Sequence, residues 1–188
     1  MLGVRVTDSA YPVLDLGELG ARAPFLTPSA AGFYEENAVV CLVHNGHRSG
    51  TPLQVAAGGE SSGIDLRWSE ERAGTLHRCY ADLVKATEFG ACAIALLLIH
   101  ELTPFVAVEQ AMRGTTVDYY LAESATDDTL VFNRSARLEV SGILAAAKGN
   151  TVAARLDSKR HRHKPESDLP TLVAIVEFGL PQATLEEI

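Results

Sequence analysis

The run Phe89–Ile99 (FGACAIALLLI) is the most apolar stretch of the chain and constrains the fold more than any other feature. Its side chains are apolar on every side of a helix, which is typical of a helix buried at the centre of a domain. The run is too short to cross a bilayer, which needs roughly 20 residues. We therefore expect a central core helix and no contact with a membrane.

The composition is typical of a soluble globular protein, with 47% hydrophobic and 21% charged residues in a chain of 188. This length predicts a single domain with a core of its own. The three cysteines, Cys41, Cys79 and Cys92, are scattered and have no C-x-x-C spacing, which indicates reduced and buried thiols. The first residues lack the pattern of a secretory signal, so we expect a cytoplasmic protein.

The first third of the chain predicts an irregular arm followed by a small antiparallel sheet. Residues 1–37 contain several prolines and glycines and show no clear periodicity, so we expect an irregular N-terminal arm. Strand-like segments joined by turns such as Asn45-Gly46 predict a β-meander over residues 38–68. Its three strands are expected at residues 38–43, 51–57 and 64–68.

Residues 69–114 predict a helical region. Ser69 is a suitable N-cap for a long helix that continues through the apolar run. The pair Thr103-Pro104 is typical of a second helix start, with threonine as the N-cap and proline in the first turn. This second, short helix is expected to end at Gly114.

Residues 115–180 predict the order β-β-α-β. Two strands surround a polar loop between Val117 and Ile143, a helix covers roughly residues 144–161, and a buried strand comes after it at residues 171–178. The whole pattern predicts an α+β fold in which helices flank a mixed β-sheet.

Two carboxylates stand out in the expected strand pair. Asp118 lies near the start of the first strand and Glu139 lies inside the second, in the sequence ARLEVSGI. Paired residues on neighbouring strands lie ~5 Å apart, so two such acids can share one Mg²⁺ ion. The alternative interpretation is that both acids lie on a solvated face of the sheet, or pair with Arg137.

From residue 104 onward this order resembles the conserved core of the PD-(D/E)XK nuclease superfamily. In that core a helix precedes a strand hairpin with an acidic pair, and a helix and a strand come after the hairpin. The resemblance implies a restriction-endonuclease-like core and Mg²⁺-dependent hydrolysis of phosphodiesters. It also implies that Asp118 and Glu139 are metal ligands, and that Glu109, or alternatively Glu101, is the helical acid found in some members.

The sequence departs from the superfamily pattern at two positions. The signature lysine would stand at position 141, where this chain has Ser141, and Val117 rather than proline precedes Asp118. Some members of the superfamily supply the basic group from the next helix, which makes Lys148 and Lys159 the candidates for the catalytic role. The other interpretation is a degenerate relative that keeps the fold and binds nucleic acid without cleaving it.

The charge distribution favours an anionic ligand at one place on an acidic protein. Residues 134–164 contain eight basic and two acidic residues, a net charge of +6, whereas the rest of the chain carries −14. Arg155, Lys159 and Arg162 share one helical face by their spacing, and Arg137 lies on the preceding strand. These four residues are our candidates for non-sequence-specific contacts with nucleic-acid phosphates. A solvated helix face, or a docking face for an acidic partner, is the alternative.

Two functions of different classes therefore remain open from the sequence alone. The first is a Mg²⁺-dependent nuclease, or a degenerate relative that binds DNA or RNA through residues 134–164. The second is a non-enzymatic adaptor subunit that assembles, as a homo-oligomer or in a larger protein complex, through its N-terminal arm and acidic surface. No nucleotide-binding glycine motif, closed zinc-ligand set or G-x-S-x-G sequence is present.

Overall fold

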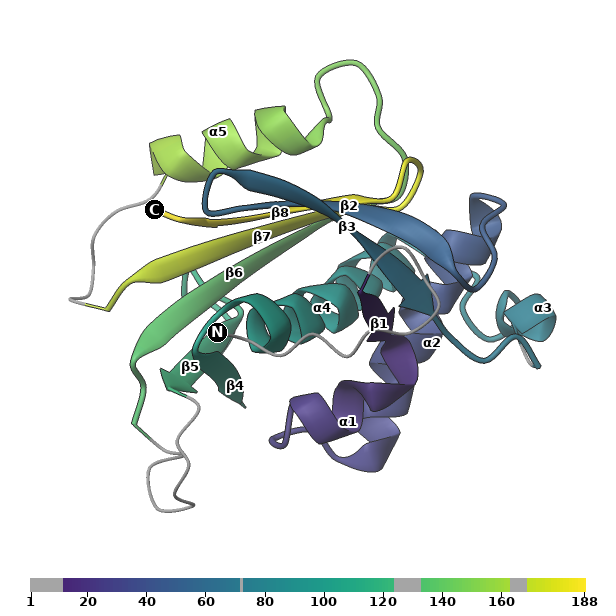
Figure 1. The fold of residues 1–188 in the computed structure, drawn as a ribbon, viewed down its shortest axis with the longest axis horizontal. Helices are drawn as coiled ribbons and strands as arrows, with labels where there is room; N and C mark the ends of the chain where they lie inside the picture. The colour runs from purple at the N-terminus through teal and green to yellow at the C-terminus, as the bar shows by residue number, and fades with distance from the viewer. Residues whose placement is uncertain (1–11, 72, 124–132, 163–168) are drawn as a thin grey trace.

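A computed structural model describes residues 12–71, 73–123, 133–162 and 169–188 and shows an α+β fold around one eight-stranded mixed sheet (Figure 1). The strands are β1 (Val13–Asp15), β2 (Thr51–Ala57), β3 (Glu60–Arg67), β4 (Phe105–Gln110), β5 (Tyr119–Glu123), β6 (Ala136–Ile143), β7 (Thr171–Glu177) and β8 (Gln182–Glu187). Their order across the sheet is β1-β3-β2-β8-β7-β6-β5-β4. The predicted class, a mixed sheet flanked by helices, is confirmed.

Helices cover both faces of the sheet, but unequally (Figure 1). The long helices α2 and α4 pack against each other on one face, and α5 lies alone on the other, over β7. The helical elements are η1 (Leu16–Glu18), α1 (Leu19–Arg22), α2 (Pro28–His44), α3 (Ala73–Leu76), α4 (Leu83–Leu102) and α5 (Val152–Arg162).

The apolar run lies in α4, which is the central helix of the fold, as predicted. Two glycines bring its neighbours unusually close. A Cβ at Gly90 would lie 2.8 Å from Ala38 Cα of α2, and a Cβ at Gly142 of β6 would overlap the carbonyl oxygen of Thr87. By length and composition α4 is also long enough to cross a membrane, and 61% of its most apolar window is buried within the fold.

The expected strand at residues 38–43 is wrong, because these residues form the last turns of α2. The helix begins at Thr27, whose side chain accepts the N–H of Ala30, and Pro28 occupies its first turn. Burial between α1, α3 and α4 stabilises this segment as a helix despite its β-branched residues. The predicted meander over residues 38–68 is therefore reduced to the β2–β3 hairpin, and the arm of residues 1–37 includes the first half of α2.

Two predictions for residues 69–114 are also wrong. No single helix runs from Ser69, since α3 is one turn long and α4 starts afresh where the Asp82 carboxylate accepts two backbone N–H groups. The predicted helix over residues 104–113 is instead strand β4, paired with β5. The Thr103 hydroxyl donates to Ile99 O at 2.6 Å, so this residue marks the end of α4.

In the last third of the chain, the predicted order β5, β6, α5, β7 is confirmed. Strands β5 and β6 are antiparallel, and β6 and β7 are parallel, with α5 as the connection between them. The helix begins at Val152, later than expected. Strand β8 was not predicted, and it joins the two halves of the sheet because it pairs with both β7 and β2.

Candidate functional site

The sheet opens at the point where Asp118 lies. Strand β5 pairs with β6 only at residues 136–138, whereas β6 continues to Ile143 with a strand partner only on its β7 side. Asp118 immediately precedes β5, and its carboxylate accepts the backbone N–H of Val140 at 2.7 Å. A side chain thus takes the place of a missing strand partner and is fixed at the fork between β5 and β6.

Two cavities meet at this fork. The α5 cavity, of about 360 Å³, lies between β6, α5 and the segment before β5, and its lining includes Thr116, Asp118, Glu139, Lys159, Arg162 and Thr171. The edge cavity, of about 710 Å³, lies between α4 and the open edge of β6. Asp118 and Val140 line both cavities, so Asp118 faces each of them.

Glu139 and Lys159 form an ion pair across the α5 cavity. Glu139 projects from β6 and Lys159 from α5, and their side chains keep only 23% and 14% of their surface exposed. This pairing, and not the Arg137 partner considered in the alternative, is what the structure shows for Glu139. The two predicted metal ligands and one of the two predicted catalytic lysines therefore line a single cavity.

The basic face of α5 points at the same region, as its spacing predicted. Arg155, Lys159 and Arg162 together line a shallow cavity beside the first one. Arg155 donates to Ser141 Oγ at 2.7 Å and to Asn150 Oδ1 at 2.8 Å. Ser141 of β6 thus orients a cation that comes from the helix.

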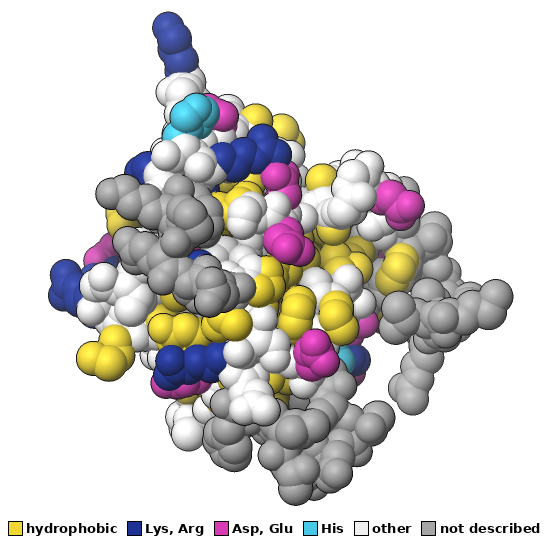
Figure 2. All heavy atoms as spheres, turned by 90° about the vertical axis from the view of Figure 1, so that its left-hand side faces the viewer, with side chains coloured by type: hydrophobic (Ala, Val, Ile, Leu, Met, Phe, Trp, Pro, Cys, Tyr) yellow, Lys and Arg dark blue, Asp and Glu magenta, His cyan; other side chains and the backbone are white. Residues whose placement is uncertain are grey.

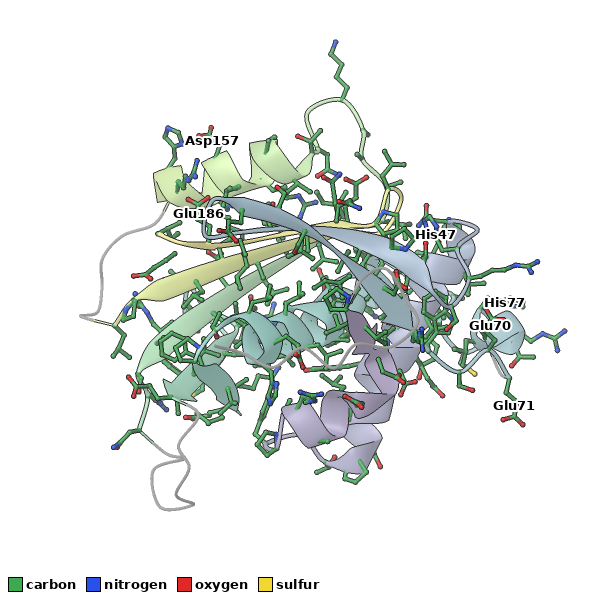
Figure 3. The ribbon with its side chains drawn as sticks, viewed as in Figure 1. His47, Glu70, Glu71, His77, Asp157 and Glu186 are labelled. Carbon is green, nitrogen blue, oxygen red and sulfur yellow. The ribbon has the colours of Figure 1, made fainter. Side chains whose placement is uncertain are left out.

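The outer side of α5 differs from this inner face. Asp157 projects away from the sheet (Figure 3). Arg160, by contrast, reaches the sheet and pairs with Glu186 of β8. Viewed from the end of the molecule where α5 terminates, the exposed surface carries Lys and Arg side chains with Asp and Glu side chains close beside several of them (Figure 2).

The electrostatics of Asp118 distinguish it from an ordinary surface acid. Although the residue keeps contact with solvent, desolvation by its surroundings raises the pKa of its carboxyl group. The Val140 N–H and Lys159 act in the opposite direction, while Glu139 and Glu88 raise the pKa further. A bound cation would relieve this crowding of negative charge.

The structure leaves three predicted site residues outside this region. Glu109 of β4 forms an exposed, bidentate ion pair with Arg134 at 2.7–3.0 Å. Glu101 pairs with Arg22 at 2.6 Å near the C-terminal end of α4, and Lys148 is exposed in the turn before α5. None of the three lines either cavity.

Arg137 was expected to contact nucleic-acid phosphates, but the structure buries it. It keeps 7% of its surface exposed, and its Nη2 donates a long hydrogen bond, 3.4 Å, to Leu169 O. Arg137 lies on the same strand face as Glu139 and is in register with the buried Thr171 of β7. A direct contact with a nucleic-acid backbone is therefore not supported for Arg137.

Sequence reasoning missed one acid, Glu88, which lines the edge cavity together with Asp118. It is an exposed residue of α4 and directly precedes the apolar run Phe89–Ile99. An exposed acid on a helix is common, so no local pattern distinguishes Glu88, and its place beside Asp118 depends on where α4 crosses the sheet.

The thiols match the expectation of reduced cysteines but not of uniform burial. Cys41 is buried, Cys92 is partly buried, and Cys79 is exposed. Burial raises the pKa of Cys41 to about 11 and that of Cys92 to about 12, so both remain protonated at neutral pH. Neither buried thiol is an activated nucleophile.

Asp118 and Glu139 are the candidate carboxylates for a Mg²⁺ site. Within the described ranges, no three side chains of the His, Cys, Asp and Glu types form a ready-made metal centre. Mg²⁺ usually binds one or two carboxylates and completes its shell with water and substrate phosphates. Asp118 and Glu139 are two carboxylates that line one cavity, and Glu139 is paired with Lys159 there.

No protein-family model, curated protein or solved structure matches this chain. The site is therefore characterised by its geometry and its chemistry.

Proposed function

We propose that this protein is a Mg²⁺-dependent, nuclease-like enzyme that hydrolyses phosphodiesters of nucleic acid. The observation that carries the proposal is that Asp118, Glu139 and Lys159, from three different elements, line one cavity. The basic face of α5 borders the same cavity and offers binding sites for the flanking phosphates.

The roles depend on the charges that hydrolysis creates. Mg²⁺, when held by Asp118 and Glu139, would offset the negative charge on the phosphate and make a bound water more acidic. Lys159, once released from Glu139, stabilises the developing negative charge or orients the attacking water. Arg155 and Arg162 hold the substrate backbone against α5 by charge, without reading its sequence.

The order of elements supports the resemblance to the PD-(D/E)XK core. A helix, α4, comes before the β5–β6 hairpin, and α5 and β7 come after it, although β4 stands between α4 and the hairpin. This assigns the role of the helical acid to Glu88, which faces Asp118, in place of Glu109 or Glu101.

Cleavage of plasmid and single-stranded substrates with Mg²⁺ or Mn²⁺ tests the proposal. We expect activity that EDTA abolishes, and that Asp118→Asn or Glu139→Gln lowers by about 100-fold or more, ~3 kcal/mol in the barrier. Glu109→Gln is the matched control, because it removes an acid of the same sheet outside the site, and it should leave activity unchanged.

Three results separate the possible functions. Intact substrates that nevertheless bind in low salt indicate the degenerate, nucleic-acid-binding relative. Failure to cleave and to bind, in a protein that runs as an oligomer, favours the adaptor subunit. Equal activity of Glu139→Gln and Glu109→Gln contradicts the proposed site.

A further inference from the structure

The edge cavity has the size and walls of a site for a small, flat and polar group. Its volume of about 710 Å³ lies within the usual range for ligand pockets. Phe89 and Tyr34 form an aromatic wall, with ring centroids 5.7 Å apart and planes inclined by 24°. Gln110 and Asn150 contribute amide groups on other sides.

The open edge of β6 presents backbone groups to this cavity. The N–H of Arg137 points to the β7 side, where Pro170 O accepts it, and the N–H of Val140 points to the opposite side, where Asp118 accepts it. By the alternation of a strand, the carbonyl of Val140 and both backbone groups of Gly142 face the open side. In the described part of the chain these three groups have no hydrogen-bond partner.

Val140 and Gly142 are half-buried, so a bound ligand can satisfy their unpaired backbone groups in place of water. Along the edge the order is acceptor (Val140), donor (Gly142) and acceptor (Gly142). Adenine and cytosine match the first two of these groups, since each carries an exocyclic amino donor for the Val140 carbonyl beside a ring nitrogen acceptor for the Gly142 N–H. Thymine and uracil present a carbonyl where the amino group would be and match it less well.

We propose that the edge cavity binds one unpaired, amino-bearing nucleobase of the substrate strand. That the bound nucleic-acid strand is the substrate depends on the function proposed above. Asp118 and Val140 line both cavities, so a base in the edge cavity places its own phosphate beside Glu139 and Lys159 in the α5 cavity. A base stacked inside a duplex does not reach the cavity, so single-stranded or unpaired regions are the preferred substrates.

The test measures binding in EDTA, which removes cleavage from the readout. Fluorescence anisotropy of the full chain is measured with oligo(dA), oligo(dC), oligo(dT) and a duplex of equal length. We expect oligo(dA) and oligo(dC) to bind about tenfold more tightly than the duplex, and more tightly than oligo(dT). In ¹⁵N-labelled protein, the Gly142 amide should shift and gain protection from exchange when oligo(dA) binds.

A matched pair of variants distinguishes binding in the edge cavity from nonspecific binding of nucleic acid to the protein surface. Val84 lines the cavity and is 72% exposed, so Val84→Trp obstructs it without disturbing the core, and it should weaken oligo(dA) binding about tenfold. Leu180 is 73% exposed and lies outside both cavities, and Leu180→Trp should have no effect.

Equal binding of single strand and duplex, or an unmoved Gly142 amide, overturns the inference. It is equally overturned if an extended peptide protects Gly142 while oligonucleotides do not, because the edge then accepts a β-strand. Base-dependent binding that moves Gly142, in a protein that cleaves nothing with Mg²⁺ or Mn²⁺, upholds the inference and refutes the proposed enzymatic function.

Discussion

The two faces of the sheet differ in what holds them together. On the α2–α4 face, apolar side chains are buried and two glycines allow helix and strand backbones to approach closely. On the α5 face, a small cluster of Ile143, Val152, Leu156, Val173 and Ile175 lies beside the ion pair and the cavities. The α2–α4 face therefore provides most of the stability. The α5 face positions charged groups and buries fewer apolar side chains.

Substitutions on the tightly packed α2–α4 face are expected to have the largest effects on stability. A methyl group at Gly142 would overlap the Thr87 carbonyl, a backbone atom that cannot move alone, so Gly142→Ala should lower the free energy of unfolding by about 3 kcal/mol. Gly32 lies in α2 with open space around it, and Gly32→Ala should instead stabilise by about 0.5–1 kcal/mol. Denaturant unfolding measures both, and a harmless Gly142→Ala would show that the two elements are not in close contact.

Substitution of one leucine on each face by alanine compares how much the two faces contribute to stability. Leu97 of α4 is 1% exposed and surrounded by core, so Leu97→Ala should cost about 3–5 kcal/mol. Leu156 of α5 is 9% exposed beside solvent, where the gap can partly close, so Leu156→Ala should cost about 2 kcal/mol or less. Urea unfolding of both variants gives the comparison, and equal losses would mean that the α5 face is as important for stability as the other.

Removal of Lys159 should lower the free energy of unfolding by less than truncation of Leu97. Lys159→Met leaves Glu139 partly buried without its cation, and we expect a loss of about 1–2 kcal/mol, between the values for buried and exposed pairs. Arg134→Met breaks the exposed pair with Glu109 and should cost about 0.5 kcal/mol or less. A smaller loss for Lys159→Met than for Arg134→Met, in thermal or urea unfolding, would contradict a partly buried pair in the α5 cavity.

The smallest effect is a pH dependence at Asp118. Its pKa is raised in the folded protein, so the stability it contributes is present at low pH and is lost as the pH rises through the folded pKa. Asp118→Asn keeps an acceptor for the Val140 N–H and removes the charge, so it should be slightly more stable than the wild type at neutral pH. The difference should vanish below about pH 4, where both side chains are neutral. A variant that is less stable than the wild type at neutral pH would mean that the Asp118 charge is favourable.

Two Thr-Pro pairs explain why the sequence predicted part of the fold incorrectly. Thr27-Pro28 starts α2, whereas the same pair at Thr103-Pro104 ends α4 and leads into β4. The pair signals a break in the chain, and the packing partner of the next segment decides whether that segment is a helix or a strand. That partner is α4 for the first pair and β5 for the second. Such long-range pairing is not visible in a local pattern.

The site was predictable to the extent that it depends on strand register and helix spacing. Asp118, Glu139 and the α5 face could be identified from local order, and the structure brings them together. Glu88 and the β6 edge could not be predicted, because both depend on where α4 crosses the sheet and on how early β5 leaves β6. Glu109 was assigned to a helix that is a strand, which placed it on the wrong element.

A crystal structure with Mn²⁺ in place of Mg²⁺ is the most direct measurement of whether the two acids form one metal site. We predict an anomalous peak bound by both Asp118 and Glu139, with Lys159 displaced from Glu139, and no such peak in Glu139→Gln. An ion bound elsewhere, or no ion at saturating Mn²⁺ with the Glu139–Lys159 pair intact, would contradict the proposed site.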